Sequence, residues 1–113
     1  MSEQEDALTK VYDLMLWFFP QAGKFPRDYR FILGDRVQNH LLDVHEWLIK
    51  ARYVKNKLDI LRSVNIRIEQ LRHLARLCKD LKLVNVKKYE YFVKELNIIG
   101  GYIGGWVKSV ERR

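Results

Sequence analysis

Three basic residues, Arg72, Arg76 and Lys79, have the types and the spacing that most favour chemistry in this chain. Separated by four and then three positions, they fall within about 60° of one another on one face of a helix. The planar fork of an arginine guanidinium suits phosphate oxygens. We therefore expect these side chains to line a phosphate track on the helix face opposite its apolar stripe, with Arg62 and Asn65 extending it.

The segment around these residues concentrates positive charge. Residues 50–88 hold twelve Lys or Arg against three Asp or Glu, a local charge of +9, whereas the rest of the chain sums to −2 because the whole carries +7. Clustered cations attract polyanions, and nucleic acid is the leading candidate. A solvated helical face with surplus lysines is the plainer alternative. The candidate contacts are Arg52, Lys55, Lys57, Arg62, Arg67, Arg72, Arg76, Lys79 and Lys82.

Binding through these cations would depend on counterion release. We therefore expect binding to weaken strongly with salt and to depend little on the base sequence of the nucleic acid. Tyr53 is the one aromatic residue between Lys50 and Lys88. A base-stacking platform for single strands is therefore not predicted.

Arg67 differs from the other basic residues of the segment. By helical rotation it lies at the edge of the apolar stripe, where an unpaired charge is costly. It either snorkels to solvent, pairs with an acid or faces a channel in an oligomer, and the sequence does not choose among the three.

Candidates for catalysis or metal binding are sparse. Glu69 and His73 are four positions apart and occur once, whereas di-iron bundles need a Glu followed three residues later by His on each of two helices. His40 and His45 are five apart and do not share a helix face. Cys78 falls in an apolar stripe, where a buried, inert thiol is expected. We therefore expect no enzyme activity, no metal and no cofactor.

The length of 113 residues is that of one domain, so we expect a single unit over residues 1–113. Cys78 is the one cysteine, which excludes an intrachain disulfide. We find neither a basic-then-apolar leader nor an apolar run of about twenty residues, and we expect a cytoplasmic protein without a signal peptide or membrane span.

Apolar residues recur at helical spacing in four stretches. Ser2 and Glu5 form a capping box at the start of the first helix. Pro20 and Gly23 are expected to stop that helix.

Pro26 fits the first position of a second helix that runs to about Tyr53. Arg30 and Gly34 are expected to share its apolar side with Val37 and the residues that follow at the same spacing.

A polar break at residues 55–57 leads into a third helix with an apolar stripe from Ile60 to Leu81. Asn85 can cap a fourth helix that continues to about Val107. Four amphipathic helices with short connections predict an all-α fold, an antiparallel up-and-down four-helix bundle.

Some apolar residues lie outside these stripes, in seams that suggest a second buried surface. Glycines spaced four apart near the end of the fourth helix would cost about 1 kcal/mol each relative to alanine, so a close packing contact must compensate. Self-association is the expected cause. The candidate interface residues are Trp17, Ile66, Leu77, Tyr91, Ile98, Gly101, Tyr102 and Gly105.

Several short strings of residues are spread nearly end to end along the chain, namely Leu14-Met15-Leu16-Trp17, Phe25-Pro26-Arg27, Arg30-Phe31, Leu33-Gly34, Arg36, Leu41-Leu42, Leu48-Ile49, Ala51-Arg52-Tyr53, Leu71-Arg72, Leu74-Ala75-Arg76-Leu77, Tyr89-Glu90-Tyr91 and Gly104-Gly105-Trp106. Together they resemble one known family, the accessory variability determinant (Avd) family of diversity-generating retroelements.

The resemblance implies a four-helix bundle that assembles as a homopentameric barrel. It also implies a basic surface that binds RNA and DNA and association with a reverse transcriptase. In that setting the protein supports template-RNA-primed, mutagenic cDNA synthesis, and the polymerase chemistry belongs to the partner. The family has no catalytic residues to carry over.

Two alternatives to the retroelement reading stay open. The same strings are similar to four-helix proteins encoded within intervening sequences of bacterial 23S ribosomal RNA. The chain could also be an oligomeric scaffold whose charge serves an acidic protein partner.

Overall fold

The structure is a computed structural model that describes residues 3–112, and every regular element in that range is helical. Ser2 of the predicted capping box lies outside the described residues. The elements, in chain order, are α1 (Glu3–Gly23), α2 (Arg27–Tyr29), the π-helical turn η1 (Arg30–Gly34), α3 (Asp35–Ala51), α4 (Lys57–Asp80) and α5 (Val86–Glu111).

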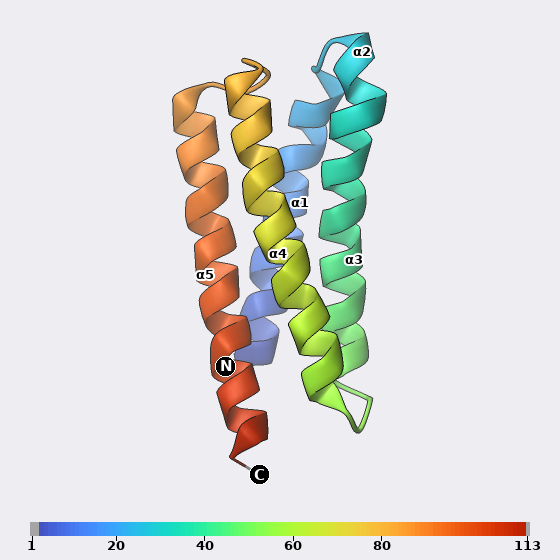
Figure 1. The fold of residues 1–113 in the computed structure, drawn as a ribbon, viewed down its shortest axis with the longest axis vertical. Coiled ribbons are helices and arrows are strands. Elements are labelled where there is room, and N and C mark those ends of the chain that lie inside the picture. The colour runs from blue at the N-terminus through green and yellow to red at the C-terminus, as the bar shows by residue number, and fades with distance from the viewer. Residues whose placement is uncertain (1–2, 113) are drawn as a thin grey trace.

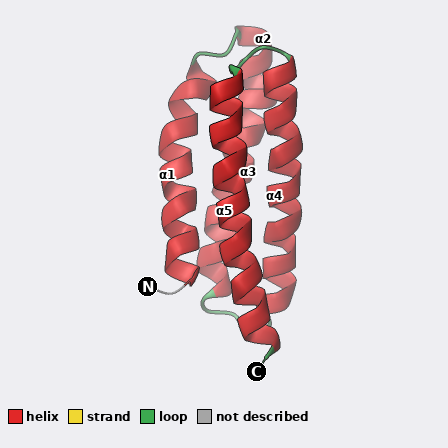
Figure 2. Cartoon of the chain, turned by 90° about the vertical axis from the view of Figure 1, so that its left-hand side faces the viewer, coloured by secondary structure: helices red, strands yellow, loops and turns green. Residues whose placement is uncertain are grey.

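These elements form four helical columns that lie side by side and alternate in chain direction. α1 runs up, α2, η1 and α3 together run down, α4 runs up and α5 runs down (Figure 1). Each column packs against the next, and α5 also packs against α1. The columns lie side by side along a body that measures 47 × 23 × 20 Å (Figure 2). The prediction of an antiparallel up-and-down four-helix bundle is confirmed.

One cluster of buried side chains fills the centre of the bundle. Burying one Leu, Ile or Phe side chain contributes about 1.5–3 kcal/mol, so this cluster is the main source of stability. α4 follows its predicted stripe with two exceptions. Leu61 is buried where Ile60 was expected, and Leu81 is 37% exposed because α4 ends at Asp80, one residue before it.

α1 continues through Pro20 to Gly23, so the prediction that Pro20 stops it is wrong. Proline removes the hydrogen bond to the carbonyl of Leu16, but both residues are exposed and water can reach that oxygen. The turn beyond Pro20 buries Ala22 completely. A Cβ at Gly34 would lie 3.4 Å from the Cβ of Ala22, so packing of this last turn outweighs the lost bond.

The second predicted helix is not regular. Pro26 lies just before α2, and the π-helical turn η1 follows. A π-helical turn holds one residue more than an α-helical turn, which rotates the preceding residues by about 100°. Arg30 is therefore exposed rather than core-facing, and its Nη2 donates to the carbonyl oxygen of Phe25 at 3.3 Å. Gly34 is buried, as predicted.

The α4–α5 turn is tightly defined. Lys82 has φ of 62°, the left-handed conformation that favours glycine. The N–H of Leu83 donates to the carbonyl of Cys78 at 2.8 Å, which is the bond of a Schellman motif with Lys82 at its left-handed position. Asn85 then caps α5 as predicted, because its Oδ1 accepts from the N–H of Lys88 at 2.8 Å.

Candidate nucleic-acid interface

Arg72 and Lys79 lie on the side of α4 that borders α5, and Arg76 lies between them along the helix. The Nε of Arg72 donates to Oδ1 of Asn97 at 2.9 Å, and the Nζ of Lys79 lies 4.6 Å from the centre of the Tyr89 ring. For these two residues the predicted position opposite the core is therefore wrong, whereas Arg76 is exposed. Arg72 and Lys79 each follow a buried residue directly along the chain. This sets each side chain about 100° from the core direction, on the flank of the helix.

Two acidic residues partly neutralise these cations. Glu69 contacts Arg72 at 2.8 Å, and Asp80 contacts Arg76 at 3.7 Å and Lys79 at 3.5 Å. Ion pairs this open to solvent are worth about 0–1 kcal/mol. A phosphate can therefore replace the carboxylate at Arg76, whose side chain is 70% exposed.

The positive surface continues across the α4–α5 turn. Lys82, Lys87 and Lys88 form no ion pair within residues 3–112. The first turn of α5 contains no acid, although the positive end of the helix dipole favours one there. Lysines at this position strengthen the attraction for anions instead. We call the combined surface the cationic strip, and its residues are Arg72, Arg76, Lys79, Lys82, Lys87 and Lys88.

Several other predicted contacts lie at the opposite end of the bundle, around the α3–α4 loop. Arg52 pairs with Glu5 of α1 at 3.9 Å, and Arg62 pairs with Asp59 at 3.9 Å. The Nζ of Lys57 donates to the carbonyls of Ala51 at 2.7 Å and Val54 at 3.1 Å, and so caps α3. Lys55 is exposed in the same loop. The nine predicted residues are thus not brought together on one surface.

Arg67 points from α4 toward α3. Its Nη2 lies 3.5 Å from Asp43, its Nη1 donates to Gln70 at 2.9 Å, and its guanidinium carbon lies 5.0 Å from the centre of the Trp47 ring. Its Nε is buried without a hydrogen-bond partner. Of the three alternatives, the structure shows pairing with an acid, on the side of α4 away from the cationic strip.

The predicted oligomer interface divides in a similar way. The rings of Trp17 and Tyr91 contact each other between α1 and α5, with centroids 4.8 Å apart and planes tilted by 53°, and Tyr91 stays partly exposed. Ile66 and Leu77 are exposed on α4. The remaining four residues line an open hollow of about 650 Å³ on α5, together with Gly104 and Lys108, and they are Ile98, Gly101, Tyr102 and Gly105. Self-association through this face stays a prediction.

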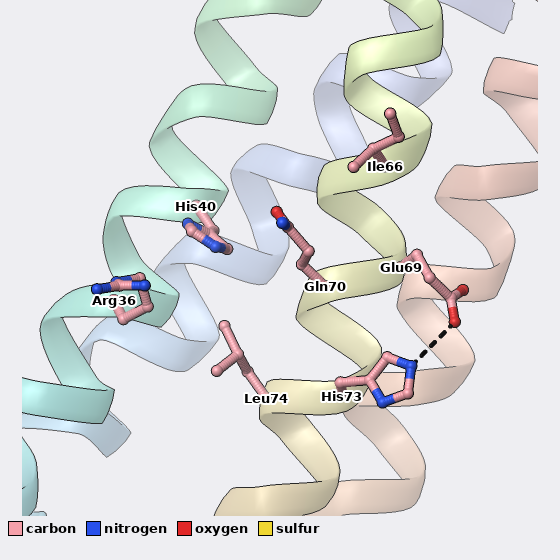
Figure 3. A pocket seen from close by; sticks show the side chains of 7 residues that line it. All are labelled: Arg36, His40, Ile66, Glu69, Gln70, His73 and Leu74. Carbon is pink, nitrogen blue, oxygen red and sulfur yellow. Dashed lines mark ion pairs between the residues drawn. The ribbon is translucent and has the colours of Figure 1, made fainter.

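Two surface features were not expected. An apolar groove of about 310 Å³ lies between α1 and α3, lined by Tyr12, Met15, Leu16, Phe19, Pro20 and Leu42. A second groove of about 440 Å³ lies between α3 and α4 and contains His40 and His73 (Figure 3). The sequence held one signal for it, because His40 stands three residues after Val37 and four before Val44, on the apolar side of its helix.

Of the chemically reactive side chains, Cys78 is blocked by burial and His73 is paired. Burial raises the pKa of the Cys78 thiol to about 11, so the thiolate is scarce at neutral pH. His73 contacts Glu69 at 3.3 Å. Within residues 3–112 no three His, Cys, Asp or Glu side chains gather as a ligand set for a metal ion. None of the helices in that range is long and apolar enough to cross a bilayer.

Comparison with known proteins identifies a family for this chain. No curated protein matches the chain. The model of the bAvd-like family matches residues 7–110, which are 104 of the 113 residues and span all four columns of the bundle. This match confirms the resemblance to the Avd family that the short strings indicated. The chain therefore belongs to the bAvd-like family.

Proposed function

We propose that this chain is a non-catalytic, nucleic-acid-binding accessory protein of a diversity-generating retroelement. Membership of the bAvd-like family supports an accessory role in such an element. In that role the chain associates with the reverse transcriptase and the template RNA of the element and supports mutagenic cDNA synthesis. The polymerase chemistry belongs to the partner. The chain works in the cytoplasm as a homo-oligomer, a pentamer by the family resemblance.

The cationic strip is the observation that carries the nucleic-acid part of this proposal. Six cations follow one another along the α4 flank, the α4–α5 turn and the start of α5, against Glu69 and Asp80 as the acids that contact them. Consecutive cations on α4 are about one helical turn apart, roughly 5.4 Å. Such a row neutralises several phosphates of one backbone, and the released counterions supply the binding free energy.

Binding measurements on matched variants test the strip. The triple variant Arg76→Ala, Lys82→Ala and Lys87→Ala removes three exposed cations from it. The control Lys50→Ala, Lys55→Ala and Arg62→Ala removes three exposed cations from the opposite end. Both lose the same charge, so a difference reports location rather than net charge. We expect the strip variant to bind RNA and duplex DNA about tenfold or more weakly at moderate salt, and the control to lose much less.

Equal losses in the two variants would contradict the strip as the binding surface. Failure of the unmodified protein to bind any nucleic acid would favour the alternative of a scaffold for an acidic protein.

Association with the polymerase has a separate test. A tagged copy of this chain is co-expressed with any reverse transcriptase that is encoded beside its gene, and the lysate is treated with nuclease before purification. We expect the polymerase to co-purify after this treatment. Loss of the polymerase would mean that nucleic acid alone bridges the two proteins. A neighbouring ribosomal RNA gene in place of a reverse transcriptase would support the intervening-sequence alternative.

A further inference from the structure

The groove between α3 and α4 contains a polar side chain without a partner. His40 is 8% exposed, and neither ring nitrogen forms a hydrogen bond within residues 3–112. Its ring lines the groove and faces the space between the two helices (Figure 3). Neither ring nitrogen is among the fully buried side-chain atoms that lack a partner, so both nitrogens can be reached from the groove. The groove therefore offers an unused donor and acceptor to a ligand.

The other residues that line the groove suit a flat, polar-edged ligand. Gln70 and Leu74 extend from α4 into the space that His40 and Arg36 border on α3 (Figure 3). The Oε1 of Gln70 accepts from Arg67 at 2.9 Å, which leaves its amide NH₂ available as a donor. Leu74 and Ile66 supply apolar surface for a ring face. Arg36, which forms no ion pair within residues 3–112, supplies a fork for a phosphate.

His40 is held in the form that this recognition needs. Burial, followed by the positive charges of Arg67 and Arg36, lowers the pKa of its imidazole. At neutral pH the ring is uncharged, with one nitrogen as a donor and the other as an acceptor. The edge of a nucleobase likewise presents donors and acceptors side by side.

The groove and the cationic strip meet at one residue of α4. Glu69 lines the groove, where its Oε1 lies 3.3 Å from His73, and its Oε2 contacts Arg72 of the strip at 2.8 Å. The two surfaces are thus separated only by the outer ridge of α4. A strand whose phosphates follow the strip can turn one nucleotide over this ridge.

We propose that the α3–α4 groove binds one unpaired nucleobase of a single-stranded nucleic acid, with His40 and Gln70 on its polar edge, Ile66 and Leu74 against its face and Arg36 on its phosphate. This inference rests on the proposed nucleic-acid function and deepens it, because it adds a preference for single strands that the strip alone does not provide. The groove residues come from two helices, so the residue pattern of a single helix does not reveal the groove.

Fluorescence anisotropy with two ligands tests the groove. The ligands are a short oligouridine RNA and a blunt RNA duplex with a similar number of phosphates. The variants are His40→Ala and Gln70→Ala, and the control is His45→Ala, a half-buried histidine of the same helix that does not line the groove. We expect the two groove variants to bind oligouridine about tenfold more weakly and the duplex within about twofold of the unmodified protein. The control should bind both ligands normally.

Gln70 is exposed, so its variant keeps the test informative even if His40→Ala fails to fold. Unchanged oligouridine binding in Gln70→Ala, or an equal loss on the duplex, would overturn the groove as a base site while leaving the cationic strip intact. If the unmodified protein binds neither ligand, the proposed function fails, and this inference fails with it.

Discussion

The guanidinium of Arg72 on α4 lies directly against Gly100 on α5, where a Cβ would be 3.1 Å from Nη2. The absent side chain leaves room for the guanidinium, which is anchored on its other edges by Asn97 at 2.9 Å and Glu69 at 2.8 Å. Gly100 therefore serves the α4–α5 contact at one end of the cationic strip. Its neighbours Gly101 and Gly104 have nothing within 4 Å of a Cβ.

Alanine substitutions separate these glycines. Gly101→Ala and Gly104→Ala should each raise the free energy of unfolding by about 1 kcal/mol, because alanine favours the helix and meets nothing. Gly100→Ala should gain less, since the Arg72 guanidinium must move. Urea unfolding measures the three values. Equal gains at all three positions would contradict the role of the Arg72 contact.

The same glycine variants examine self-association. Sedimentation of Gly101→Ala and Gly104→Ala shows whether the hollow on α5 lies between copies of the chain. A smaller assembly made of well-folded chains would place these glycines at a subunit interface, as the sequence predicts. An unchanged assembly would place the interface elsewhere.

Lys82→Gly should stabilise the protein while weakening its nucleic-acid binding. Glycine relieves the left-handed backbone at this position, where a side chain costs about 1 kcal/mol. Lys87→Gly is the matched control, because it removes the same charge from the first turn of α5, where glycine lowers stability. Thermal unfolding should shift up for Lys82→Gly and down for Lys87→Gly, whereas both should bind less tightly. A downward shift for Lys82→Gly would be inconsistent with the turn described above.

The four helices and their order could be predicted from the sequence because apolar residues at helical spacing need to be buried. The π-helical turn could not. The turn ends at Gly34, which lies close to Ala22 and Phe25, and a contact between residues about ten positions apart is not encoded in any single apolar stripe. For the same reason, the prediction that Arg30 faces the core is wrong.

The candidate site was predicted in part. Charge density identified α4 and the turn after it, but the rotation of Arg72 and Lys79 toward α5 depends on Asn97 and Tyr89, which lie on another helix. Counting charges also included Lys57, whose ammonium caps α3. The pairing of Arg67 with Asp43 and the groove at His40 both arise where α3 meets α4, so a helix-by-helix reading could not locate them.

His40 should make the fold sensitive to mild acid. Its pKa lies below the ordinary 6.5 in the folded state, so the unfolded chain binds the proton first as the pH falls. Stability should therefore be complete above pH 6.5 and should decline as the pH falls below it toward the folded pKa. His40→Gln should flatten this part of the curve of melting temperature against pH, and His45→Gln should not. Identical curves for His40→Gln and the unmodified protein would rule out this assignment.

Cys78 should react with thiol reagents only when the chain unfolds. The side chain is 1% exposed and burial raises its pKa to about 11, so both access and thiolate are lacking. At mildly alkaline pH we expect labelling roughly 10³-fold or more slower than in denaturant. Rapid labelling of the folded protein would show that the α4 core opens locally.

The salt dependence of binding tests the central claim, that the cationic strip holds the phosphates of a nucleic acid. Affinity for duplex DNA is measured over a series of salt concentrations for the unmodified protein and for the variant Arg72→Ala, Arg76→Ala and Lys79→Ala. We predict a linear log-log plot whose slope becomes shallower by about one for each lost phosphate contact, about three in total. A variant that keeps the slope of the unmodified protein would contradict the claim.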